Sequence, residues 1–142
     1  VIFLLSGSLI ANYNRFNDNQ KLKQAALTLK NTLRAAQSRA LAGQKPTSGC
    51  TQLVGFEIAF ISASGYSLQA RCSEGLAGEV TDVTLPTGVT FSPVPSSILF
   101  GVLTGRTNRT SDVSLILFGR TKRYTLLLHP NGDIEDSGFG AL

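Results

Sequence analysis

Side chains that could take part in chemistry are few and widely spaced in this sequence. Among 142 residues there are one histidine, His129, and two cysteines, Cys50 and Cys72. A protein zinc site generally takes three or four nitrogen or sulfur ligands, and a Cys–His or Ser–His catalytic pair would have to use this single histidine. No nucleophile motif, paired-carboxylate site or glycine-rich phosphate loop accompanies them. The sequence therefore predicts no enzyme, no metal and no cofactor, with His129 an ordinary strand residue.

The two cysteines allow two interpretations. A disulfide between Cys50 and Cys72 would suit a domain outside the cytoplasm. The residues between them include a predicted hairpin whose turn lies near residues 63–64, which places Cys50 opposite residue 77. The flexible stretch 44–49 could still bring the two cysteines together. The alternative is a pair of unrelated thiols, and a Cα–Cα separation of about 4.4–6.8 Å would decide for the bridge.

Two short loops concentrate positive charge beside glycines. They are Gly-Arg-Thr-Asn-Arg over residues 105–109 and Gly-Arg-Thr-Lys-Arg over residues 119–123. Basic side chains in flexible loops suit contacts with nucleic-acid phosphates, which give affinity without reading sequence. The candidate DNA-contacting residues are Arg106, Arg109, Arg120, Lys122 and Arg123. The alternative is that these charges keep a hairpin tip soluble or pair with an acidic surface on a neighbouring molecule.

Residues 12–43 have the pattern of an amphipathic helix. Apolar residues recur at alternating spacings of four and three, as one face of a helix requires. No proline interrupts residues 1–45, and Gly43 followed by Pro46 is a typical helix end. The apolar stripe predicted to pack this helix consists of Leu22, Ala26, Leu29, Leu33, Ala36 and Ala40.

The start of the chain extends this helix with an apolar segment, VIFLLSGSLIA over residues 1–11. Eleven residues are fewer than the roughly 20 that span a bilayer, which indicates the end of a longer apolar helix. A helix of about 43 residues measures roughly 65 Å, whereas a domain of about 100 residues has a radius of gyration near 13 Å. We therefore expect residues 1–13 to project from the remainder, into lipid or among other protein chains.

Basic residues are concentrated in this helical segment. Residues 1–45 hold seven Lys and Arg against one Asp, a net charge of +6, whereas residues 46–142 hold six basic and eight acidic residues, a net charge of −2. The helix lysines suit anionic lipid headgroups, neighbouring molecules or simply a solvated face. The charged fraction of 15% and the apolar fraction of 42% exclude a disordered, highly charged chain.

Residues 46–142 predict a β-rich head. Short apolar runs are separated by turn signals such as Ser-Ala-Ser-Gly (62–65) and Pro-Asn-Gly-Asp (130–133). Because the connections are short, we expect the strands to pair mostly antiparallel. The expected strands are 52–61, 66–72, 80–85, 88–91, 97–103, 113–118 and 124–129, with one short edge strand after residue 134.

The order of these elements resembles the type IV pilin-like proteins, which join a long N-terminal helix to a small β head. The segment KLKQAALTLKNTLRAAQSRALAGQ (21–44) is similar to the helix end of the GspH/FimT group of minor pilins and pseudopilins. LPTGVTF (85–91), SILFGVLTG (97–105) and VSLILFGRTKRYTLLLHPNGDI (113–134) are similar to the closing strands of that group. The helix positions that carry the likeness are Leu33, Ala36, Ser38, Arg39 and Ala40.

The resemblance implies an α+β, pilin-like fold: a long N-terminal helix (1–45) packed on a small antiparallel β-sheet head (46–142). It implies a structural subunit of a type IV pilus or a type II secretion pseudopilus that assembles through its helix. The implied partners are other pilin or pseudopilin subunits and, before assembly, the bacterial inner membrane, crossed once; the implied location is then an extracytoplasmic filament. The alternative is a DNA-binding minor pilin of a DNA-uptake pilus that acts through loops 105–109 and 119–123.

Overall fold

One long helix, α1 (Ile2–Ala42), precedes eight β-strands. The computed structural model describes the backbone of residues 2–142 and the side chains of residues 15–142. The helix ends where the sequence predicts, because Gly43 adopts a φ of 63° that side-chain-bearing residues disfavour. The Gly43 amide donates to the carbonyl of Ala40 and the Gln44 amide donates to the carbonyl of Arg39. This pair of hydrogen bonds is the Schellman arrangement, which closes off the last free helix carbonyls.

The head contains two four-stranded antiparallel sheets rather than the single small sheet that the resemblance implies. In the first sheet the strand order is β3-β2-β1-β5, and in the second it is β4-β6-β7-β8. The strands of the first sheet are β1 (Leu53–Ser62), β2 (Gly65–Cys72), β3 (Gly75–Thr84) and β5 (Ile98–Gly101). Those of the second are β4 (Thr90–Phe91), β6 (Val113–Phe118), β7 (Lys122–Leu128) and β8 (Ile134–Ala141).

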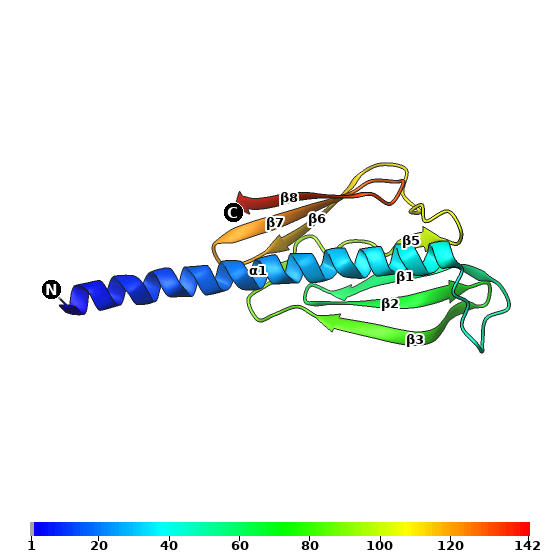
Figure 1. Cartoon of the computed structure of the whole chain (residues 1–142), viewed down its shortest axis with the longest axis horizontal. Coiled ribbons are helices and arrows are strands. Elements are labelled where there is room, and N and C mark those ends of the chain that lie inside the picture. The colour runs from blue at the N-terminus through cyan, green and yellow to red at the C-terminus, as the bar shows by residue number, and fades with distance from the viewer. Residues whose placement is uncertain (1) are drawn as a thin grey trace.

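Helix α1 packs against both sheets of the head. In Figure 1, β1 to β3 run along one side of the helix and β6 to β8 run along the other. The helix touches β1 and β5 of the first sheet and β6 and β7 of the second. One apolar core therefore forms from the helix and the inner faces of both sheets. Its fully buried strand residues include Ile58, Ile98, Phe100, Leu115, Leu117 and Leu126.

Two strands are longer than the sequence predicts. Strand β3 begins at Gly75 instead of residue 80, because Ser73 and Glu74 form a tight turn that pairs Gly75 with Cys72. Strand β8 has eight residues and pairs with the whole of β7, whereas only a short edge strand was expected. Glycines within both strands weaken the local β preference. Both strands also lie at sheet edges and bury few side chains. The apolar pattern of their sequences is therefore too weak to predict their full length.

A polar contact joins the helix to β8. The Lys30 ammonium lies 3.8 Å from one carboxylate oxygen of Asp136, and the Tyr124 hydroxyl donates to the other oxygen at 2.6 Å. Burial, and then the hydrogen bond to this carboxylate, raise the pKa of Tyr124 to about 12, so the phenol stays protonated and remains a donor. Asp136 therefore connects the helix surface with the second sheet outside the apolar core.

Candidate functional site

The predicted apolar stripe of α1 is covered by the protein's own head. All six stripe residues, from Leu22 to Ala40, have no exposed surface, and Ala25 is nearly as buried. The stripe forms because spacings of three and four place these side chains on one helix face. Any contact that the helix makes with other molecules must therefore use its remaining faces or the part before Leu22.

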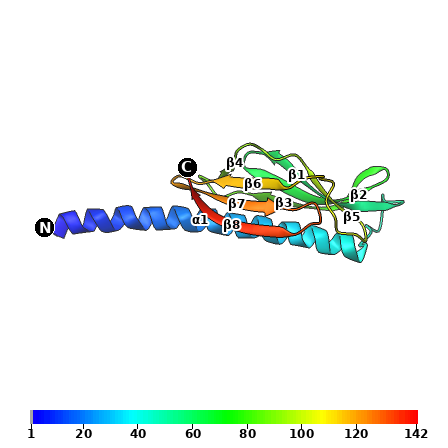
Figure 2. The ribbon, with the colours of Figure 1, turned by 90° about the horizontal axis from the view of Figure 1, so that it is seen from above.

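The first part of α1 extends beyond both sheets. Figure 2 shows the helix continuing past the β-strands toward the N-terminus. Phe16, near the point where the helix leaves the head, keeps 61% of its surface exposed. The side chains of the apolar segment predicted over residues 1–13 lie outside the described residues. The backbone is nevertheless helical from Ile2 onward, so the apolar sequence lies on a projecting helix.

The two basic loops lie at opposite ends of the head. Near one end, the Thr121 hydroxyl donates to the side-chain oxygen of Asn19 at 3.1 Å. Near the other, the side-chain amide of Gln37 donates to the carbonyl of Gly105 at 3.1 Å. Asn19 and Gln37 are 18 residues apart on one helix, which corresponds to roughly 27 Å. The five predicted DNA-contacting side chains therefore do not form one surface.

Loop 105–109 acts as a brace: its hydrogen bonds connect neighbouring segments at the end of the head remote from the N-terminus. The Thr107 amide and hydroxyl both donate to the carbonyl of Pro130, at 2.9 and 3.0 Å. The Asn108 amide donates to the carbonyl of Leu99, and the Arg109 guanidinium donates to the carbonyl of Ser97 at 2.9 Å. One of its two arginines, Arg109, is thus engaged with backbone, whereas Arg106 is exposed.

Loop 119–123 forms an exposed hairpin tip. The Gly119 amide donates to the carbonyl of Lys122 at 2.8 Å, which closes a tight turn between β6 and β7. The side chains of Arg120, Lys122 and Arg123 are all exposed. Lys122 places its ammonium 5.5 Å from the centre of the Phe139 ring, which is a cation–π contact. This tip therefore presents three exposed positive charges to the surroundings.

No protein-family model, curated protein or solved structure matches this chain. The resemblance to pilin-like proteins thus continues to depend on the residues quoted above. Within the described residues, no helix is both long enough and apolar enough to cross a membrane.

The predicted disulfide between Cys50 and Cys72 is present, with a Cα–Cα distance of 5.4 Å. Glu74 supports it from the neighbouring turn by accepting hydrogen bonds from the amide and hydroxyl of Thr51. These bonds, the hydroxyl bond first, lower the pKa of Glu74 to about 2. Glu74 also lies near both sulfurs, but sulfurs joined in a disulfide offer no thiolate to a metal ion. The arrangement therefore fastens the loop after α1 to the β2–β3 turn.

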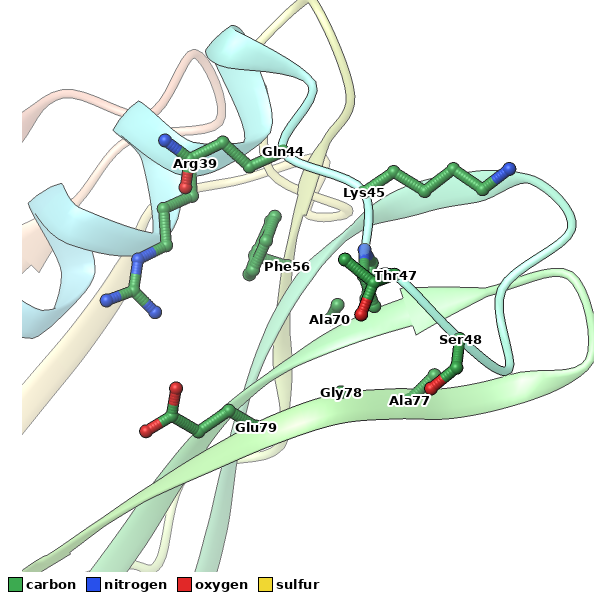
Figure 3. A pocket seen from close by; sticks show the side chains of 11 residues that line it. Arg39, Gln44, Lys45, Thr47, Ser48, Phe56, Ala70, Ala77, Gly78 and Glu79 are labelled. Atoms are coloured by element: carbon green, nitrogen blue, oxygen red, sulfur yellow. The ribbon is translucent and has the colours of Figure 1, made fainter.

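An open hollow of about 410 Å³ lies between the end of α1, the loop that follows it and β3. Its apolar wall includes Phe56, Ala70 and Ala77. Figure 3 shows the Arg39 guanidinium and the Glu79 carboxylate on the same side of the hollow, on the helix and on β3 respectively. The rim thus offers charges of both signs, which suits the binding of polar side chains on another molecule.

An ionic cluster surrounds His129, which the sequence predicts to be an ordinary strand residue. His129 lies one residue beyond β7, with Nδ1 2.9 Å from Asp112 and Nε2 3.3 Å from Glu135. The hydrogen bond with Asp112, together with the charges of both carboxylates, raises the pKa of His129 although desolvation opposes this. The cluster connects the segments before β6, after β7 and within β8. No sequence signal could reveal it, because the carboxylates lie at unrelated spacings from the histidine.

Proposed function

We propose that the chain is a structural subunit of an extracytoplasmic filament, a minor pilin or pseudopilin of a type IV pilus or of a type II secretion pseudopilus. The helix that extends past its own head carries this proposal. At 41 residues α1 is roughly 60 Å long, and within the described side chains the head buries its apolar stripe from Leu22 to Ala40. The part before that residue begins with the apolar sequence of residues 1–11, which needs lipid or other protein around it.

In the proposed filament the projecting helices pack together in the core and the heads face outward. Burial of apolar side chains stabilises this arrangement by roughly 25 cal/mol for each Å² removed from water. The contacting surfaces on two neighbouring copies differ from one another. Such heterologous contacts produce open filaments when the rotation that relates each copy to the next does not close a ring. Before assembly, the same apolar segment would be held in the inner membrane.

Charge and redox chemistry support the same proposal. The helical segment carries a net charge of +6 and the head a net charge of −2, so the exposed helix of one copy complements the head of another. Arg15, Lys23 and Arg34 are among the exposed basic residues on α1. The Cys50–Cys72 disulfide suits a head that folds outside the cytoplasm.

The DNA-uptake alternative depends on loops 105–109 and 119–123. Because these loops lie at opposite ends of the head and Arg109 is bonded to the backbone of Ser97, a DNA segment would meet a single exposed loop. A site of that size offers few phosphate contacts, and each contact contributes to affinity and to its salt dependence. We therefore favour the filament subunit.

The experiment compares two aspartate substitutions on α1 in cells that produce the protein. Surface filaments are sheared from the cells, and an antibody against the head is used to quantify the protein in them by immunoelectron microscopy and blotting. Leu9→Asp places a charge in the apolar segment and should lower the filament-associated amount at least about tenfold, because an unpaired charge in an apolar helix core is costly. Ser38→Asp, at an exposed position of the same helix, should leave it unchanged.

Absence of the unsubstituted protein from every filament would contradict the proposal. Equal recovery of the Leu9→Asp and Ser38→Asp proteins in filaments would also contradict it, because assembly would then not depend on the apolar segment.

A further inference from the structure

A cluster of cations and aromatic rings surrounds the point where α1 leaves the head. We call it the helix-exit surface. It combines two residues of the helix, the hairpin tip between β6 and β7, and one aromatic residue of β8. Its members are Arg15, Phe16, Arg120, Lys122, Arg123 and Phe139.

Helix geometry places the two parts of this surface together. Asn19 holds the hairpin tip through Thr121, at 3.1 Å. Arg15 precedes Asn19 by four residues and Phe16 precedes it by three, so both lie on the same side of the helix within about one turn of the tip. The side chain of Leu22 packs against Gly119 from the next turn. The tip and the outgoing helix therefore form one continuous end of the molecule.

The charge of the helix-exit surface is left uncompensated. Its four basic side chains and the one acidic residue of the adjoining helix turn, Asp18, add up to a net charge of +3. Within residues 15–142, none of the four takes part in an ion pair, in contrast to Lys30 with Asp136 and Arg71 with Glu57. The side chains of Arg120 and Arg123 instead pass beside glycines, with Nε of Arg120 next to Gly88 and Nε of Arg123 next to Gly140.

Exposed apolar groups are interleaved with these charges. Phe16 exposes 61% of its surface and Phe139 exposes 42%. Lys122 and Phe139 line an open hollow of about 340 Å³ beside the last strand. Positive charge around exposed rings and a shallow hollow fits a ligand in which a phosphate group is attached to an apolar tail.

We infer that the helix-exit surface docks on an anionic lipid membrane, with Arg120, Lys122 and Arg123 on the lipid phosphates and Phe16 at the headgroup level. Each basic residue close to an anionic leaflet adds to binding, and exposed phenylalanine side chains can enter the boundary between headgroups and acyl chains. The helix continues from this surface with the apolar residues 1–11, so its direction leads from the headgroups into the lipid. This inference deepens the proposed function, since it rests on the membrane-held subunit that precedes the filament.

The exposed rings favour a lipid surface over a nucleic acid as the partner. A duplex presents phosphates without an apolar layer behind them, and the helix that leaves the head beside the tip would obstruct a rigid rod. Loop 105–109 lies roughly 27 Å from this surface, which is more than three Debye lengths at physiological salt. The far loop therefore contributes little to membrane attraction and supplies a natural control.

The test measures partition of the full chain, released from detergent by dilution, onto two kinds of vesicle. One kind is phosphatidylcholine, and the other is an equal mixture of phosphatidylcholine and phosphatidylglycerol. The test variant is Arg120→Gln, Lys122→Gln and Arg123→Gln together. The control variant removes the same charge at the far end, with Arg39→Gln, Lys45→Gln and Arg106→Gln together. Both variants keep the apolar segment unchanged.

We expect the unsubstituted chain to prefer the anionic vesicles. The tip variant should lose about a hundredfold of that preference, because this is the combined contribution of three basic residues to binding at an anionic leaflet. The far-end variant should lose less than about threefold. Equal losses in the two variants would overturn the inference. So would a tip variant that binds the anionic vesicles normally but loses affinity for a duplex DNA at the same salt concentration.

The two vesicle types separate this inference from the proposed function. Binding to neutral vesicles reports on the apolar segment alone, so its absence would count against the membrane-held subunit. The difference between anionic and neutral vesicles reports on the helix-exit surface, and its absence would count only against the docking described here.

Discussion

The two ends of the head carry nearly the same pentapeptide and use it in opposite ways. Gly-Arg-Thr-Asn-Arg at residues 105–109 is folded back onto β5 and onto Pro130, and its last arginine is bonded to backbone. Gly-Arg-Thr-Lys-Arg at residues 119–123 forms a hairpin tip whose three cations remain exposed. Local sequence thus sets the charge of a loop, whereas the neighbouring segments decide whether that charge is available to a partner.

The far end of the head is fastened by several independent links. The disulfide joins the loop after α1 to β2, and the Leu103 amide donates to the carbonyl of Ala40 at the end of the helix. Gln37 holds Gly105 through a further hydrogen bond. At the helix-exit end, among residues 15–142, one side-chain hydrogen bond, from Thr121 to Asn19, joins the tip to the helix. Four predictions test this difference.

Removal of the disulfide should have the largest effect. Cys50→Ser with Cys72→Ser opens a bridge that spans 22 residues, and the loop-closure relation gives a loss of about 3 kcal/mol in the free energy of unfolding. Urea unfolding of the full chain in mild detergent would measure it. Hydrogen exchange should accelerate in β2, β3 and the loop before β1, with β6 and β7 largely unaffected. Equal acceleration at both ends of the head would contradict the comparison.

Matched alanine substitutions of the first glycine in each loop should differ next. Gly105 is buried at a φ of 64°, and an added Cβ would lie 2.9 Å from Cγ of Leu41, so Gly105→Ala should cost about 2 kcal/mol. Around Gly119 the nearest atoms would lie at 3.2 Å, and Gly119→Ala should cost less than about 1 kcal/mol. Urea midpoints compare the two. A larger effect at Gly119 would show that the tip is the more tightly constrained loop.

The last arginine of each loop provides a smaller contrast. Arg109→Ala removes the hydrogen bond to the carbonyl of Ser97 and should cost about 1 kcal/mol of stability. Arg123→Ala removes an exposed side chain and should change stability by less than about 0.5 kcal/mol. Thermal unfolding of both variants would measure the difference. Similar losses for the two would remove the distinction between brace and tip.

The smallest expected effect concerns pH at the far end. The folded-state pKa of His129 is raised above its usual value, so the charged form is favoured by folding. The stabilisation is fully present below the unfolded-state pKa of about 6.5 and is lost as the pH rises through the folded-state pKa. NMR titration of the His129 ring should show this raised pKa. Asp112→Asn should lower it, whereas Asp82→Asn, an exposed substitution on β3, should leave it unchanged.

Features that depend on local sequence were predictable. The helix end at Gly43 follows from the conformational freedom of glycine, and the stripe from Leu22 to Ala40 follows from helical spacing. The last hairpin follows from two apolar strands around Gly119–Arg123, and the disulfide was one of two open alternatives. In each case the residues that determine the feature are close together or are few in number.

Features that depend on tertiary pairing were not predictable. The division into two sheets is set by which strands pair with β1 and β6, and apolar patterns do not specify partners. The two basic loops were identified as candidates, but their separation depends on contacts such as that of Thr121 with Asn19, 102 residues apart. The cluster at His129 likewise arises from three segments that the fold brings together.

The alignment of α1 with the strands has a mechanical consequence. In Figure 1 the strands of both sheets run roughly along the helix, so a pull on the projecting part is directed along the buried stripe. Every apolar contact from Leu22 to Ala40 then resists the load at once, in shear, instead of yielding one after another as in peeling. We expect the head to withstand tension along the helix far better than tension across it, which is the direction of load that a subunit within a stretched fibre would experience.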